Sequence, residues 1–124
     1  MKREIKFRAY FYTEKRMLSW EELCNGTEYL QEYLEQKMSD VSPAMQFTGL
    51  HDKNGKEIYE GDILKGQVFN IDNPDGYEEI KDEVEFEEGS FCGGISHLSE
   101  WDMEETEIIG NIYENPGLLK QEAE

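Results

Sequence analysis

The sequence predicts a small, mainly β domain with one amphipathic helix inserted after the first strands. Short segments in which apolar and polar residues alternate recur along the chain. Clusters of Gly, Asn, Asp and Pro separate them, and only one stretch has helical spacing. A chain of 124 residues can bury one modest core. We therefore expect a single domain over residues 1–118 and a frayed tail over residues 119–124.

The opening segment alternates with a period of two, because Ile5, Phe7, Ala9 and Phe11 fall on one face. This pattern predicts a strand, followed by a polar turn at 13–16 and a short return strand at 17–20.

A helix is predicted next. Ser19 stands three residues before Glu22, as capping residues do at helix starts, and Asn25 precedes Glu28 in the same way. Apolar residues at helical spacing then place one amphipathic helix at about residues 27–38, and Ser42-Pro43 ends it.

Two hairpins are predicted in the middle of the chain. Segments 45–48 and 57–59 flank residues 51–56, in which Asn54-Gly55 favours a type I′ turn. After a sharp bend at 60–62, residues 63–69 continue as a strand in which Gly66 is a candidate bulge. Residues 70–76 form an exposed loop.

The last strands follow from alternation and glycine turns. Residues 83–87 form a strand with an acidic outer face, and Glu88-Gly89 turns it into residues 90–95. Residues 106–113 carry apolar side chains on both faces, which predicts a central strand. Asn115-Pro116-Gly117 ends the fold.

Composition favours a folded domain with an acidic surface. The net charge of -17 and the mean hydropathy of -0.80 are typical of disordered chains. However, seven Tyr, six Phe and two Trp supply the apolar area that a core needs.

The charge is unevenly distributed. Residues 1–16 carry six Lys or Arg against two Glu, whereas residues 66–124 carry two against seventeen acidic groups. We expect the basic first strand, with Lys6 and Arg8, to pair with an acidic strand of the same chain, or else of a neighbouring subunit.

Three blocks together resemble the YopX family. They are residues 3–9, residues 47–63 with the run Asp52-Lys53-Asn54-Gly55, and residues 108–116. The resemblance implies a small mixed β-sandwich or β-barrel domain of phage or prophage type with no established enzymatic role. It supplies no catalytic residues.

Candidate chemistry is sparse. Glu57, Glu60 and Asp62 could hold a cation, but a turn in which Asp62 accepts local backbone hydrogens explains them better. Acidic residues at 72–82 lack the calcium-loop pattern.

Thiol chemistry has one conceivable site. Cys92 could meet His97 on neighbouring strand positions, while Cys24 and His51 lie elsewhere in the sequence. Nothing marks a base or an oxyanion site, so we expect two free thiols and no catalytic, cofactor or metal residues.

The sequence therefore favours a non-enzymatic binding or assembly module that acts through protein–protein contacts, with itself as a homo-oligomer or with a host protein. An acidic DNA mimic is the alternative, whereas direct nucleic-acid binding is opposed by the net charge. No apolar run reaches the ~20 residues of a membrane span and no signal-peptide core is present, so we expect a protein of the bacterial cytoplasm. The candidate interaction residues are Lys6, Arg8, Trp20, Glu83, Glu85, Glu87, Trp101 and Tyr113.

Overall fold

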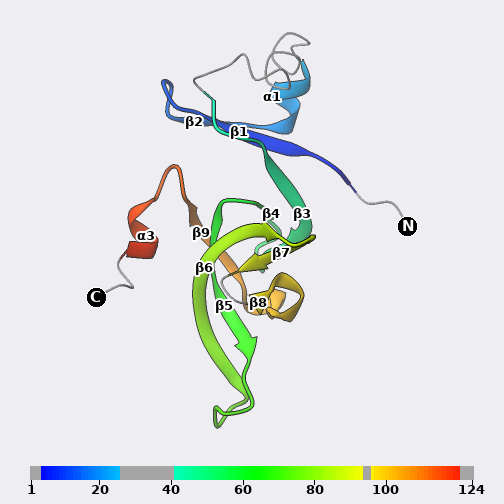
Figure 1. The fold of residues 1–124 in the computed structure, drawn as a ribbon, viewed down its shortest axis with the longest axis vertical. Coiled ribbons are helices and arrows are strands. Elements are labelled where there is room, and N and C mark those ends of the chain that lie inside the picture. Colours follow the sequence, from blue (N-terminus) through cyan, green and yellow to red (C-terminus); the bar gives the residue numbers. More distant parts are fainter. Residues whose placement is uncertain (1–3, 26–40, 94–95, 121–124) are drawn as a thin grey trace. The chain divides into compact units, whose positions relative to one another are not determined.

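The computed structural model describes residues 4–25, 41–93 and 96–120, and these are mostly β-strand (Figure 1). The strands are β1 (Phe7–Phe11), β2 (Arg16–Leu18), β3 (Met45–His51), β4 (Glu57–Tyr59), β5 (Asp62–Phe69), β6 (Tyr77–Glu87), β7 (Ser90–Gly93), β8 (Ser96–His97) and β9 (Glu107–Asn111). The helices are α1 (Trp20–Asn25), the 3-10 turns η1 (Leu98–Glu100) and η2 (Met103–Glu105), and α3 (Gly117–Lys120).

The strands form two antiparallel sheets, ordered β2-β1-β3-β4 and β8-β7-β6-β5-β9. The predicted mainly β fold is confirmed, and a short helix, α1, follows the first two strands. The chain divides into two compact units, residues 1–47 and 48–124. A single domain over residues 1–118 stays a prediction.

In the first unit, β1 lies between β2 and the start of β3, so both of its edges have strand partners. Ala9 pairs with Leu18, and Arg8 pairs with Met45. Neither β2 nor β3 is acidic in sequence. The prediction that the basic strand pairs with an acidic strand of its own chain is therefore wrong at the level of the sheet.

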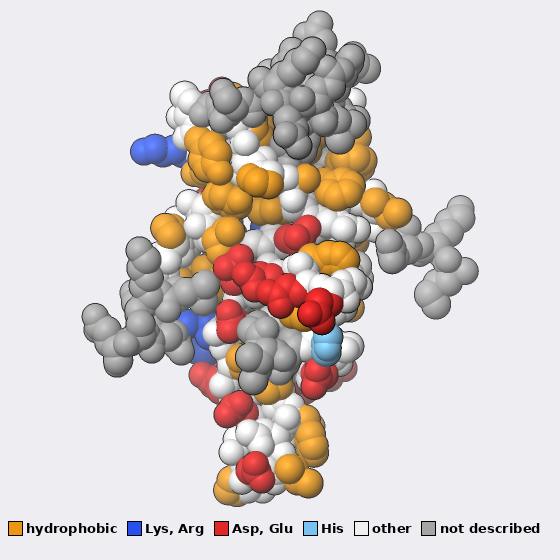
Figure 2. Space-filling model, in the orientation of Figure 1, with side chains coloured by type: hydrophobic (Ala, Val, Ile, Leu, Met, Phe, Trp, Pro, Cys, Tyr) orange, Lys and Arg blue, Asp and Glu red, His pale blue; other side chains and the backbone are white. Residues whose placement is uncertain are grey.

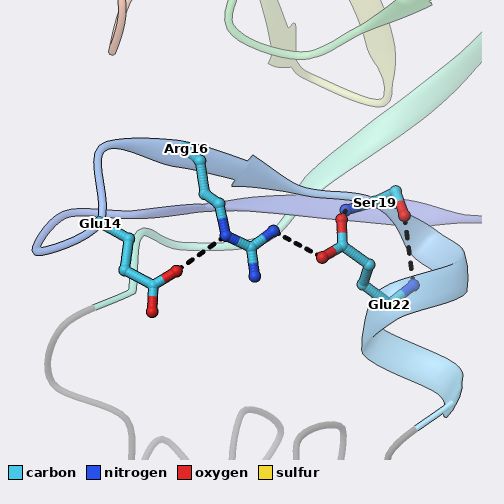
Figure 3. Close-up of polar contacts among 4 residues, drawn as sticks. All are labelled: Glu14, Arg16, Ser19 and Glu22. Carbon is cyan, nitrogen blue, oxygen red and sulfur yellow. Dashed lines mark hydrogen bonds and ion pairs between the residues drawn. The ribbon is translucent and has the colours of Figure 1, made fainter.

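Helix α1 begins at the predicted capping box. The Ser19 hydroxyl accepts the Glu22 amide hydrogen at 3.2 Å, and a Glu22 carboxylate oxygen accepts from the Ser19 amide at 3.2 Å (Figure 3). Arg16 donates to both Glu14 and Glu22. These bonds hold the first turn of α1, which begins two residues after the end of β2. The helix predicted at about 27–38 lies outside the described residues.

The second unit is built on the long β5–β6 hairpin. Seven register pairs run from Ile63–Glu83 to Phe69–Tyr77, and the predicted exposed loop at 70–76 joins the strands. β6 then continues past β5 to pair with β7. The joining residues Glu88 and Gly89 both have positive φ, 50° and 86°. Positive φ at both positions is the requirement of a type I′ turn, so this predicted turn is confirmed.

The β3–β4 hairpin is present, but its predicted type I′ turn is wrong. Of the two central residues only Gly55 has positive φ, 83°. The Asp52 carboxylate sets the loop, because one of its oxygens accepts from the amides of Asn54 and Lys56, each at 2.9 Å. Its other oxygen accepts from the Ile108 amide at 3.0 Å and so ties the hairpin to β9.

Two further expectations need correction. Gly66 pairs regularly with Ile80, and the register shift lies between Ile63 and Leu64 instead. Strand β9 lies at one edge of its sheet and is not central. Gly110 on this strand lies against Asn115 and Leu118, whose side-chain atoms are within 3 Å of where a Cβ on Gly110 would stand.

The core of the second unit contains Ile58, Leu64, Val68, Val84, Leu98 and Trp101. Trp101 packs against two glycines, since a Cβ on Gly93 would lie 2.7 Å from the indole and one on Gly66 would lie 3.2 Å from it. Only 4% of Trp101 is exposed. Its predicted role as an exposed docking aromatic is therefore wrong.

The chain turns after β9 into the short helix α3, which includes residues 119 and 120 of the predicted tail. Residues 121–124 lie outside the described part. Within the described ranges, no helix has the length and apolar character needed to cross a membrane.

Candidate interaction surface

The end of the β5–β6 hairpin presents large apolar side chains to solvent. Phe69 is 68% exposed, Ile71 is 81% exposed and Tyr77 is 43% exposed. We call these three residues the hairpin tip. Figure 2 shows hydrophobic side chains gathered where this hairpin ends. Such residues normally turn inward, so three of them together form an exposed apolar patch.

The loop holds the hairpin tip in place with its own hydrogen bonds. The Asn70 amide donates to the Gly76 carbonyl at 2.8 Å, and the Asp75 carboxylate accepts from the Tyr77 amide at 3.0 Å. The rings of Phe69 and Tyr77 meet edge to face, with centroids 6.4 Å apart. The apolar side chains therefore stand on an ordered turn.

Strand β6 carries a line of carboxylates on one face. Glu83, Glu85 and Glu87 alternate with Val84 and Phe86, and we call these three glutamates the acidic row. Figure 2 shows Asp and Glu side chains in a band across this side of the molecule.

Two glutamates of the acidic row have raised pKa values. Partial burial raises the pKa of Glu83, and the charges of Glu85 and Asp82 raise it further. Burial also raises the pKa of Glu85, together with the charge of Glu87 and a hydrogen bond to it. A cationic partner would relieve this repulsion.

Beside the acidic row lies a polar cluster of Ser90, Cys92 and His97. The sheet register aligns Cys92 with Glu85 on one side and with His97 on the other, so these residues form one line across three strands. His97 Nδ1 lies 2.9 Å from Ser90 Oγ and 3.6 Å from Cys92 Sγ. The predicted meeting of Cys92 and His97 is confirmed. Both cysteines are free thiols, and Cys24 lies in α1 of the other unit.

The other candidate residues are dispersed. Lys6 forms an ion pair with Glu4 at 3.5 Å, and its ammonium lies 4.8 Å from the centre of the Phe47 ring. Trp20 packs against the Phe7 ring at 5.9 Å. Tyr113 is half-buried after β9, where its amide donates to Asn111. Of the eight predicted interaction residues, the structure aligns only the three glutamates of the acidic row on one strand.

The acidic residues at the β4–β5 bend have a structural role in a turn. Asp62 is 2% exposed, and its carboxylate accepts from the Tyr59 amide at 2.8 Å, as the turn interpretation requires. Among residues 4–25, 41–93 and 96–120, no three His, Cys, Asp or Glu side chains already converge as they would around a metal.

Sequence reasoning missed the hairpin tip. The loop at 70–76 is predicted to be exposed, and Phe69 and Tyr77 border it. Apolar residues that border or lie within an exposed turn are the signal that could have identified the patch.

The fold and these sites can be compared with known proteins. The family model described as YopX protein matches residues 6–120, nearly the whole chain. The chain belongs to the YopX family. The match extends over both compact units, so the YopX domain includes the hairpin tip, the acidic row and the polar cluster.

A solved structure shares the fold of this YopX domain. The crystal structure of protein EF1440 from Enterococcus faecalis is 25% identical in sequence and superposes with a TM-score of 0.60. The similarity covers 95% of this chain and 99% of that one. No curated protein matches the sequence.

Proposed function

We propose that this YopX domain is a non-enzymatic protein-binding module, in which the hairpin tip and the acidic row dock on a basic surface of another protein in the bacterial cytoplasm. The observation that carries the proposal is the exposure of Phe69, Ile71 and Tyr77 at the end of one ordered hairpin. Burying a side chain of this size contributes about 1.5–3 kcal/mol. Three such anchors suit the centre of a protein interface.

The charge around the hairpin tip selects the class of partner. Asp72 and Asp75 lie in the loop, and Glu78 and Glu79 follow Tyr77 on β6. Anionic lipid surfaces and nucleic acids would be repelled by this rim. A protein surface with Lys or Arg around an apolar hollow is complementary to it.

The acidic row supports the same partner. Burial and the charges of neighbouring carboxylates raise the pKa values of Glu83 and Glu85, so the ionised row carries a cost in the free domain. Bringing cationic side chains against them removes that cost and speeds association through long-range attraction.

Mimicry of DNA is a narrower form of this proposal. Alternate residues of a strand lie about 6.6 Å apart, so the acidic row presents three regularly spaced negative charges. On this alternative the basic surface would be the nucleic-acid site of the partner, and duplex DNA would compete with the YopX domain.

The experiment compares three double variants of the full chain. Phe69→Ser with Ile71→Ser removes apolar anchors, Glu85→Gln with Glu87→Gln weakens the acidic row, and Glu104→Gln with Glu105→Gln is the matched control on η2. Each variant is immobilised, exposed to a bacterial lysate, and its bound proteins are identified by mass spectrometry. The affinity of each captured protein, once purified, is then measured at low and high salt.

We expect the tip variant to weaken binding at least about tenfold, which corresponds to about 1.4 kcal/mol. The acidic variant should weaken binding mainly at low salt, because salt screens exposed charges, and the control should bind like the unmodified chain. If all three variants bind the same proteins equally well, the surface is not the one used.

Light scattering distinguishes a second copy of the chain from a different protein. An oligomer that persists at low and high salt and is lost in the tip variant would identify the partner as another copy. Displacement of a captured protein by duplex DNA would favour the mimic.

A further inference from the structure

We infer that Cys92 and His97, with Glu85 beside them, form a binding site for a thiophilic divalent cation of the zinc class. This inference does not depend on the proposed protein-binding role, although Glu85 belongs to both sites. It begins from the geometry of Ser90, Cys92 and His97 in the polar cluster, which that role does not use.

The distance between the two donor atoms matches metal coordination. Cys92 Sγ lies 3.6 Å from His97 Nδ1. In a tetrahedral site with a Zn–S bond of about 2.3 Å and a Zn–N bond of about 2.1 Å, the two donor atoms are about 3.6 Å apart. The pair therefore stands at the spacing of two adjacent zinc ligands without any movement of the backbone.

The sheet holds this pair in place. Cys92 and His97 are register partners on β7 and β8, and the His97 amide donates to Glu100 at 3.2 Å. The Ser90 hydroxyl oxygen and the Cys92 sulfur both lie within hydrogen-bonding distance of His97 Nδ1. An imidazole nitrogen without a hydrogen is the form that binds a cation, and a cation at Nδ1 would replace its hydrogen-bonded hydrogen.

Binding exchanges a proton for the metal. The Cys92 S–H bond breaks, its proton passes to solvent, and the sulfur forms a bond to the cation. No electron is transferred. Sulfur and imidazole ligands together select zinc over calcium or magnesium, which prefer oxygen.

Glu85 supplies the third ligand. It is the register partner of Cys92 on β6, so its carboxylate starts from the same face of the sheet. Since no three ligand side chains converge in the described residues, Glu85 must rotate toward the pair on binding. Water completes the fourth position on the exposed side of His97.

The test is a titration of the reduced full-length chain with Co²⁺, which reports thiolate coordination by a charge-transfer band in the near ultraviolet. We expect one Co²⁺ to bind per chain, with zinc displacing it. Cys92→Ser and His97→Ala should lose the band, and Glu85→Gln should weaken binding at least about tenfold.

The chain offers matched controls, because it has one other cysteine and one other histidine. Cys24→Ser and His51→Ala should keep the band. A titration without a band, or one in which the band follows Cys24 instead of Cys92, would overturn the inference.

A second measurement needs no variant. Zinc should slow the alkylation of Cys92 by iodoacetamide, followed by mass spectrometry, and leave Cys24 in the same molecules unchanged. Equal alkylation of Cys92 with and without zinc would contradict the site even if the variants failed to fold.

Discussion

Asp52 shows how one side chain connects distant parts of the YopX domain. Its carboxylate accepts three backbone amide hydrogens, from Asn54, Lys56 and Ile108, while only 5% of the residue is exposed. Burial by itself would raise the pKa of Asp52, but these amides and the charge of Lys56 outweigh it and lower the pKa. Folding therefore favours the ionised form of the Asp52 carboxylate.

Replacement of Asp52 should be costly. Asp52→Ala leaves three amides without their acceptor, and we expect a loss of about 3 kcal/mol in the free energy of unfolding. Urea denaturation measures it. Asp72→Ala, which removes an exposed loop carboxylate, is the control and should change stability by less than about 0.5 kcal/mol. Equal effects of the two substitutions would contradict the role given to Asp52.

At the scale of the element, α1 is a helix that depends on its first turn. It has only six residues, fewer than an isolated helix needs, so the capping box and the buried Leu23 side chain hold it. Arg16 adds a bond from β2, and this bond lowers the pKa of Glu22.

Loss of the cap should destabilise the domain. Ser19→Ala removes the hydroxyl that accepts from Glu22, and we expect about 1 kcal/mol less stability and a fall of about 4 °C in Tm. Ser19→Asp keeps an acceptor and should remain near the original Tm in a calorimetric scan. The cap is unimportant if Ser19→Ala melts at the same temperature as Ser19→Asp.

Elements defined by local patterns could be predicted from the sequence. Alternation located β1 and β5, and the Glu88-Gly89 turn followed from its glycine. Predictions that depended on side-chain hydrogen bonds or on the order of strands in a sheet failed. The type I′ turn at Asn54-Gly55 is absent because the Asp52 side chain takes the loop amides, and β9 is an edge strand although both its faces are apolar.

The candidate sites also differ in how far the local sequence pattern predicts them. The acidic row is visible in sequence because alternate residues of a strand share a face. Trp101 was misplaced, since its burial depends on Gly66 and Gly93, which are distant in sequence. The meeting of Cys92 with His97 was conceivable from the sequence, whereas the alignment of Glu85 with Cys92 required the register of β6 and β7.

For the whole molecule, the balance of its carboxylates sets how stability depends on pH. Glu83 and Glu85 have raised pKa values in the folded state, so the folded chain binds more protons than the unfolded chain just above the ordinary glutamate pKa. Stability should therefore rise as the pH falls from 7 toward that range. At lower pH stability should decrease again, because the stabilising charge of Asp52 is lost as the pH falls through its lowered pKa.

We expect a stability maximum at mildly acidic pH, measured by urea denaturation in dilute solution between pH 7 and pH 3. Glu83→Gln removes part of the repulsion, so it should be about 0.5 kcal/mol more stable at pH 7 and gain less on acidification. A steady decline of stability from pH 7 downward would show that repulsion in the acidic row does not govern this range.

The division of the chain into two compact units also gives each unit its own fluorescent reporter. The sequence has two tryptophans, and Trp20 belongs to the first unit while Trp101 lies in the core of the second. Trp20→Phe and Trp101→Phe each leave a single emitter, so the melting of each unit can be followed by its own emission. Coincident transitions would mean that residues 1–47 and 48–124 unfold as one cooperative domain, and separate transitions would mean two.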